Sequence, residues 1–292
     1  MKKLALTSLL AFMAVSGAHA ANVIDGNPLY MPKAGHFYSE TTLATHSEPG
    51  RVWALGEDFG YGISDKLAVD VSTAFGEQDA FDTYSWSNLA LGLTFRAIDD
   101  ASMKLDVVGS YVAGSPVDST LAALVPGALM YHVPGTTEWF DKDATSYTWT
   151  LGVRGGFVGS NWTVAAHALF NYWNTESFKW GADAGEQGFH TIALGLDGQF
   201  VIDPHWNLVA GVEYVGVLDK EAFGIPGATI ENAGKWSGEF GVNYNIDATK
   251  YVGVYVNGVM DHWKGDGIMA GTEKGWGFEK GFGFGAKFGI DF

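Results

Sequence analysis

The chain has 292 residues, of which 47% are hydrophobic and 14% aromatic, with 33 acidic and 17 basic side chains and no cysteine. A net charge of -16 argues against nucleic acid as a partner, because phosphate backbones are bound through an excess of lysine and arginine. A mean hydropathy near zero indicates alternating apolar and polar positions, whereas membrane-spanning helices would raise it.

Residues 1–20 have the pattern of a secretory signal peptide. A basic start, an apolar stretch and a small-residue cleavage site follow one another as Lys2 and Lys3, residues 4–15, and Ala18-His19-Ala20. We therefore expect a mature chain that begins near Ala21 and reaches the periplasm or the outer membrane. Without cysteine it should carry neither a lipoprotein anchor nor disulfides. We expect residues 21–35 to form a short periplasmic lead-in outside the barrel, too small for a plug domain.

Twelve segments of the remaining chain alternate apolar and polar residues, as strands with one apolar face do. Tight turns rich in Asp, Asn, Ser and Pro separate them in alternation with longer polar loops. Most segments are long enough to cross a bilayer as tilted strands of about 9 to 11 residues. The expected strands lie near residues 36–46, 51–62, 67–77, 87–97, 103–113, 147–158, 162–173, 190–202, 207–218, 235–246, 251–262 and 281–292.

The even strand count, with both ends of residues 36–292 on the turn side, predicts an all-β, closed antiparallel barrel with lipid outside. Tryptophan and tyrosine near the strand ends favour this barrel over a soluble β-sandwich, which would also alternate. The polar faces are expected to line a lumen and carry Asp70, Arg96, Lys104, Asp106, Arg154, His167, Asp197, Glu213, Glu239, Asp261 and Lys287.

The first two strands fit this pattern least well. Neither face of residues 36–46 is clearly apolar, and in the next strand Glu57 shares a face with Leu55 and Phe59. Two interpretations are open: a strand that protrudes beyond the bilayer, or a β-bulge that shifts the register.

The last twelve residues place apolar side chains at every even position opposite a face of glycine, Lys287 and Asp291, and end in Phe292. A chain that ends in such a strand resembles the bacterial outer-membrane β-barrel proteins. The resemblance implies periplasmic termini, contact with outer-membrane lipids and lipopolysaccharide, and a location in the outer membrane of a Gram-negative bacterium. It also implies that the barrel-assembly machinery recognises the end of the chain at Phe288, Ile290 and Phe292.

The longest loop, from Gly114 to Ser146, contains an apolar stretch over residues 121–130. General porins fold the loop after their fifth strand into the lumen, and this loop occupies the equivalent place. We expect a constriction at the barrel mouth, with a hydrophobic cap on the rim or a contact site for protein or lipopolysaccharide as alternatives. The residues expected to pack against the inner wall are Leu121, Leu124, Val125 and Leu129.

No motif predicts catalysis, a metal site or a cofactor. The chain has no phosphate-binding loop motif, and its histidines lack metal-ligand spacing. Asp261-His262, with Asp79 and Asp82 in an outer loop, faintly resembles the site of an omptin-like protease. Because adjacent strand residues point to opposite faces, Asp261 and His262 are not expected to share a cleft. An outer-membrane lipase or protease therefore stays a minor alternative.

Many inward positions are small, which favours a narrow water-filled channel over a barrel filled by side chains. A closed structural or adhesive barrel is the alternative, because wall charges can also pair and seal a lumen. The acidic outer loops and the acidic excess of the inward wall predict passage of cations or neutral solutes rather than anions. The sequence does not set the solute or the oligomeric state.

Overall fold

The computed structural model of the chain describes residues 26–46, 52–77, 84–114, 146–175, 187–219, 228–267, 273–274 and 280–292. Its strands are β1 Phe37–His46, β2 Val52–Ser64, β3 Leu67–Glu77, β4 Tyr84–Asp99, β5 Met103–Gly114, β6 Ser146–Val158, β7 Trp162–Thr175, β8 Gln187–Val201, β9 Trp206–Val217, β10 Ala228–Asn245, β11 Lys250–Gly267, β12 Glu273–Lys274 and β13 Lys280–Asp291. Within these ranges no helix is long and apolar enough to cross a membrane.

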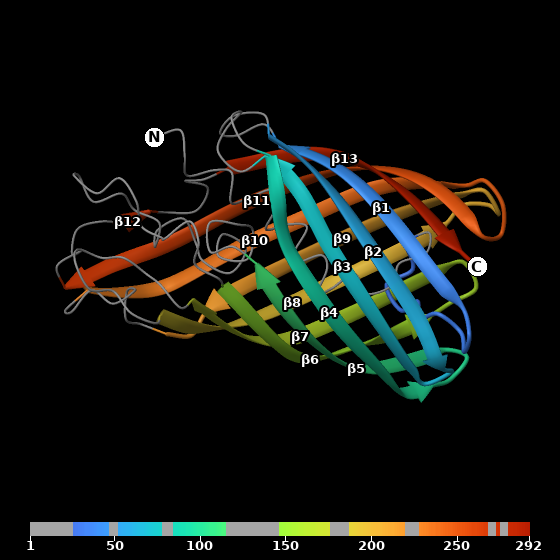
Figure 1. Ribbon diagram of the computed structural model, residues 1–292, viewed down its shortest axis with the longest axis horizontal. Helices are drawn as coiled ribbons and strands as arrows, with labels where there is room; N and C mark the ends of the chain where they lie inside the picture. The colour runs from blue at the N-terminus through green and yellow to red at the C-terminus, as the bar shows by residue number, and fades with distance from the viewer. Residues whose placement is uncertain are drawn as a thin grey trace.

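The strands form one closed antiparallel barrel (Figure 1). Each strand from β1 to β11 pairs with its neighbours in sequence, and β13 closes the wall by pairing with both β11 and β1. The two-residue β12 pairs only with Trp263 and Lys264 of β11, so the wall itself has twelve strands. The predicted fold class and strand count are confirmed, and the expected strands match the observed ones in position.

The short connections lie together at one end of the barrel, here called the turn end, beside the C-terminus (Figure 1). Aspartate side chains stabilise these turns, because their carboxyl oxygens accept hydrogen bonds from backbone amides. Asp203 Oδ1 accepts from the amides of His205 at 2.7 Å and Trp206 at 2.9 Å. Hydrogen bonds from the Thr249 amide and hydroxyl hold the pKa of the Asp247 carboxyl below its usual value. That the turn end faces the periplasm stays a prediction.

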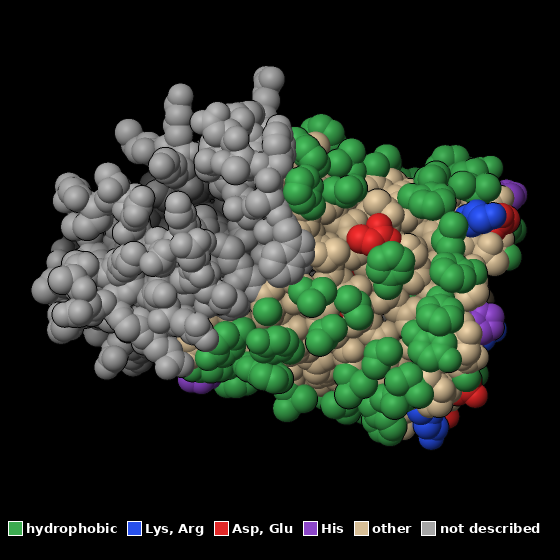
Figure 2. Space-filling view, viewed as in Figure 1, with side chains coloured by type: hydrophobic (Ala, Val, Ile, Leu, Met, Phe, Trp, Pro, Cys, Tyr) green, Lys and Arg blue, Asp and Glu red, His purple; other side chains and the backbone are tan. Residues whose placement is uncertain are grey.

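The outer surface of the barrel is apolar, as the alternation predicts (Figure 2). Outward side chains in the middle of the strands are extensively exposed, and Leu151 on β6 reaches 65%. Their neighbours in sequence point inward and are largely buried, as Thr150 on β6 shows. An exposed apolar belt around a polar interior is the arrangement of a barrel surrounded by lipid.

The irregularity expected at the first two strands is not a bulge. β1 and β2 pair in unbroken register from Phe37 opposite Tyr61 to His46 opposite Val52. Between β2 and β3 the register shifts only near the turn, at Gly62/Ser64. Glu57 therefore truly faces outward, so the bulge interpretation is wrong. Ser39 and Thr41 of β1 lie on the same outward face, and their hydroxyl groups donate hydrogen bonds to the Glu57 carboxyl.

The last residue of the chain completes the seam between the first and last strands. The Phe37 amide donates to the Phe292 carbonyl at 2.8 Å, and the Phe292 amide donates to the Phe37 carbonyl at 2.9 Å. The two rings stack with centroids 5.9 Å apart. Phe292 thus adds two backbone hydrogen bonds and a ring contact where the barrel closes.

Deletion of Phe292 is expected to reduce the yield of folded barrel, because it removes this last backbone pair and the stacked ring. The measurement is the folded fraction after refolding into detergent micelles and after expression in cells. Phe284→Ala, which removes an exposed aromatic from the same strand, is the control and should fold nearly as well as the unmodified chain. A normal yield from the truncated chain would contradict the prediction.

Candidate functional site

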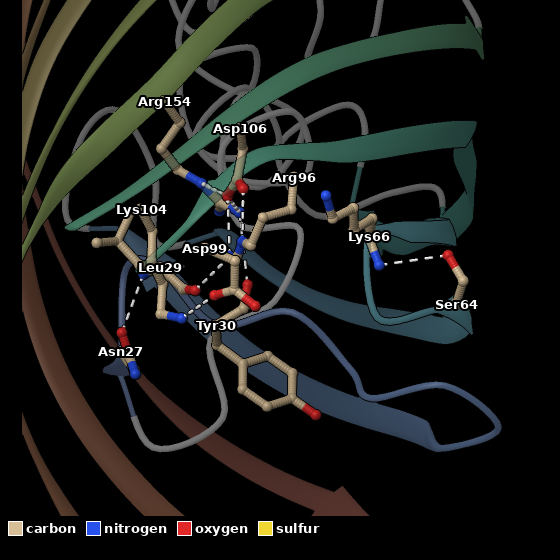
Figure 3. A network of polar contacts seen from close by, with 10 residues as sticks. All are labelled: Asn27, Leu29, Tyr30, Ser64, Lys66, Arg96, Asp99, Lys104, Asp106 and Arg154. Carbon is tan, nitrogen blue, oxygen red and sulfur yellow. Dashed lines mark hydrogen bonds and ion pairs between the residues drawn. The ribbon is translucent and has the colours of Figure 1, made fainter. Parts of the chain in front are cut away.

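A buried ionic bridge spans three neighbouring strands on the inner wall near the turn end (Figure 3). Arg96 of β4, Asp106 of β5 and Arg154 of β6 are cross-strand partners, so alternation aims all three side chains inward at one level. Arg96 Nε lies 2.8 Å from Asp106 Oδ1, and Arg154 Nη2 lies 2.8 Å from Asp106 Oδ2. Asp106 is 0% exposed, so one buried carboxylate holds two guanidinium groups.

The same two arginines hold the segment that precedes β1. Arg96 Nη2 donates to the Leu29 carbonyl at 2.7 Å, and Arg154 Nη2 to the Tyr30 carbonyl at 3.4 Å (Figure 3). Tyr30 also reaches other strands: its hydroxyl donates to Asp291 at 3.3 Å, and its ring meets the Tyr38 ring edge-on at 6.0 Å. Leu29 is only 1% exposed, as expected of a residue inside the barrel.

Residues 26–33, here called the crossing segment, extend across the lumen. At one end a Cβ on Gly26 would overlap the Val209 side chain of β9. At the other end a Cβ on Gly62 of β2 would overlap the Lys33 carbonyl. Four strands separate β2 from β9 in one direction around the wall and six in the other. The lead-in was expected to lie outside the barrel, whereas this part of it packs inside, because inward arginines bind its carbonyls.

A second ionic group continues the inward row beyond Arg154. His167 of β7 pairs with Arg154 across the strands, and its ring lies between two carboxylates. Nδ1 is 3.0 Å from Asp197 Oδ2 of β8, and Nε2 is 3.1 Å from Glu213 Oε2 of β9. Gly195 makes room for the ring, since a Cβ there would overlap it. Charged or imidazole groups therefore follow one another along the wall from β4 to β9.

The opposite wall carries a third group on β1, β10, β11 and β13. Lys287 Nζ lies 3.2 Å from Glu239 Oε1 and 4.8 Å from the centre of the Tyr255 ring. The Tyr251 hydroxyl donates to the Glu40 carboxyl. The contacts of Glu239 with Lys287 and of Glu40 with Tyr251 each join strands that are separated by one strand of the wall, so the polar groups of this wall are also bonded to one another.

The predicted lumen residues are distributed over these groups and the rim. Lys104 contacts Asp99 at the turn end and is not part of the inward row that runs from Arg96 to His167 (Figure 3). Asp70 faces inward and is 5% exposed. Asp261 lies in β11 opposite Lys235, but its side chain is outside the described residues. The loop residues Leu121, Leu124, Val125 and Leu129, and the acidic outer loops, also lie outside them.

Other expected residues are placed without a test of their role. Phe288 and Phe292 face outward with exposed side chains, and Ile290 of the same face is partly exposed. Their recognition by the assembly machinery stays a prediction.

Sequence reasoning missed several inward side chains on β1, β2 and β11. Tyr38 and Asp58 form a hydrogen bond of 3.1 Å inside the barrel, and Glu40 was not assigned to the lumen. The available signal was that Phe37 and Leu43 define an outward face of β1, which turns Tyr38 and Glu40 inward. The hydroxyl residues on that outward face concealed the pattern.

No family model matches the sequence, and no curated protein matches it. Among solved structures, the NanC porin is similar over 86% of this chain and 98% of its own, with 6% identity and a TM-score of 0.51. The translocator domain of the autotransporter NalP from Neisseria meningitidis is 13% identical over 95% of this chain and 92% of its own, with a TM-score of 0.49. The KdgM porin is 8% identical over 85% of this chain and 98% of its own, with a TM-score of 0.45.

The fold and this similarity define the class of protein. The chain is a twelve-stranded antiparallel β-barrel of the outer-membrane type. At 6% identity the similarity to the NanC porin shows the fold alone.

Proposed function

We propose that the chain forms a narrow, porin-like channel for small solutes in the outer membrane of a Gram-negative bacterium. The main support for this proposal is the inward row of ionic side chains from β4 to β9, which is enclosed by a wall whose outer surface is apolar. Charged side chains inside a lipid-surrounded barrel favour a water-filled lumen. The shared fold of the NanC porin is consistent with this role. The proposal includes no catalytic step and no cofactor.

A closed structural or adhesive barrel is the second candidate, and one observation favours it. The crossing segment occupies part of the lumen at the turn end, and the ionic groups of the wall pair with one another. Conductance of the folded protein in a planar lipid bilayer separates the two candidates. Steady single-channel openings support the channel, whereas silence from protein that is demonstrably folded supports the closed barrel.

The channel is expected to pass cations in preference to anions, because inward carboxylates outnumber inward cations among the described residues. The carboxylates are Glu40, Asp58, Asp70, Asp99, Asp106, Asp197, Glu213, Glu239 and Asp291. The cations are Arg96, Lys104, Arg154, Lys235 and Lys287. A low-dielectric wall focuses the field of this excess into the lumen, so mobile cations concentrate there.

Reversal potentials in a salt gradient measure this preference. The cation preference should weaken as ionic strength rises, since screening acts over about 10 Å at 0.1 M salt. Glu40→Gln should lower the ratio of cation to anion permeability, whereas Asp100→Asn in an exposed turn should change it little. Preference for anions at low ionic strength would contradict the charge prediction even for an open pore.

A further inference from the structure

Three inward carboxylates lie on three adjacent strands of the barrel wall (Figure 1). They are Glu40 of β1, Asp58 of β2 and Asp70 of β3, here called the acidic triplet. Glu40 and Asp58 are direct cross-strand partners, and Asp70 lies diagonally across from Asp58, because its own partner on β2 is Gly60. Like charges in such positions repel one another, so the triplet needs a counter-charge.

No basic residue of the described chain forms an ion pair with the acidic triplet. Arg154 attracts Asp70 from a longer distance, but its guanidinium bonds to Asp106. Lys287 attracts Glu40 in the same way, but its ammonium bonds to Glu239. The other inward carboxylates with described side chains all lie beside a lysine, arginine or histidine; they are Asp99, Asp106, Asp197, Glu213, Glu239 and Asp291.

Two members of the triplet have buried oxygens without a donor. The Asp70 side chain is 5% exposed and forms no hydrogen bond with a described residue. Its carboxyl lies over Gly92 of β4, where a Cβ would come within 2.1 Å of Oδ2. Asp58 Oδ2 accepts from the Tyr38 hydroxyl at 3.1 Å, but its buried Oδ1 has no partner in the described chain. Buried oxygens of this kind are costly unless a ligand donates hydrogen bonds to them.

Aromatic rings border these carboxylates. A Cβ on Gly60 would overlap the Tyr38 ring, so the ring lies across β2 on the side of Asp70, the partner of Gly60 on β3. The Tyr30 ring of the crossing segment meets the Tyr38 ring edge-on at 6.0 Å. Carboxylates and the faces of aromatic rings both attract organic cations.

The neighbouring wall shows how this lumen holds an ammonium group. Lys287 Nζ lies 3.2 Å from Glu239 Oε1 and 4.8 Å from the centre of the Tyr255 ring. The acidic triplet offers the same two kinds of group without a lysine of its own. Across the described ranges, no three or more histidine, aspartate or glutamate side chains are placed to hold a metal ion. The spacing of the triplet therefore suits a larger, organic cation.

We infer that the acidic triplet binds an organic cation that carries primary ammonium groups, such as a linear diamine. An ammonium has three donors in no fixed plane, which suits oxygens supplied by two strands, and a second ammonium balances more of the charge. Glu40 and Asp58 are partly exposed, so a solute in the lumen reaches them, with Asp70 behind them. Passage of such a solute rests on the proposed channel function, whereas binding to the triplet does not.

Titration calorimetry of the folded protein in nonionic detergent at low ionic strength tests this binding. The probe 1,4-diaminobutane should bind, whereas 1,4-butanediol, the same chain without charge, should not. Asp70→Asn and Asp58→Asn should each weaken binding about tenfold, the usual contribution of a hydrogen bond to a charged group. Glu57→Gln removes the same charge from the outer face of the same strand as Asp58. It is the matched control and should bind as the unmodified chain does.

Two calorimetric results would overturn the inference: no binding by the folded unmodified chain, or equal binding by Asp70→Asn. Equal competition by sodium at the concentration of the probe would overturn the organic class of the ligand. Asp70→Asn should fold as well as the unmodified chain, since it removes a buried charge without a partner, and gel mobility with and without heating verifies this.

Planar bilayers separate this site from the proposed channel. If the barrel conducts, 1,4-diaminobutane should reduce the potassium current, and Asp70→Asn should require about tenfold more of it. Binding by a folded barrel that never opens would contradict the channel and leave the site intact. Steady openings without binding would support the channel and refute the site.

Discussion

Deletion of residues 26–33 is expected to raise single-channel conductance severalfold. The crossing segment reaches from Val209 on β9 to Gly62 on β2, and its removal clears the described part of the lumen at the turn end. It also frees Arg96 and Arg154 from the carbonyls of Leu29 and Tyr30, which adds polar surface for water. The measurement is conductance in planar bilayers, with protein expressed from residue 21 and refolded in detergent.

The matched control for this deletion is a chain that begins at Gly26, which is shorter but keeps the whole crossing segment. Its conductance should equal that of the longer chain. If the deletion and the control conduct equally, the narrowest part of the lumen lies elsewhere. If the longer chain is silent and the deletion opens steady channels, the crossing segment is the closure and the barrel beneath it is a channel.

Asp106→Asn is expected to lower the free energy of unfolding by roughly 3 to 5 kcal/mol, the usual effect of removing one partner from a buried ion pair. Asp106 is fully buried and bonded to both Arg96 and Arg154 at 2.8 Å, so the change leaves two guanidinium groups without their shared carboxylate. Denaturant unfolding from lipid vesicles gives the free energy. The lumen also gains positive charge, which should shift the reversal potential toward anions.

Asp99→Asn is the control for this substitution. Asp99 also contacts Arg96, at 3.8 Å, but it lies at the rim with a side chain 40% exposed. Exposed ion pairs contribute about 0 to 1 kcal/mol, so its effect should be small. If the two substitutions lowered the free energy of unfolding equally, water in the lumen would be solvating Arg96 and Arg154 in place of the Asp106 carboxylate. The buried bridge would then contribute little to stability.

Much of the barrel follows from local pattern alone. A strand repeats every two residues, so the exposed leucines of β4, Leu89, Leu91 and Leu93, already identify its outward face in the sequence. Turns that contain an aspartate, such as residues 202–205, end the strands, because the Asp203 side chain accepts hydrogen bonds from amides two and three residues further on. The inward positions of Arg96, Asp106 and Arg154 follow from the same alternation.

Contacts between distant segments were decided only by the tertiary structure. Asp106 bonds to Arg154, 48 residues away, and Arg96 to the Leu29 carbonyl, 67 residues away, and no local pattern predicts such partners. The crossing segment has no strand periodicity, so its place inside the barrel depends on acceptor carbonyls that every residue possesses. Glu57 contradicts the alternation of β2, and only the unbroken register with β1, which brings Ser39 and Thr41 to its carboxyl, shows that it faces outward.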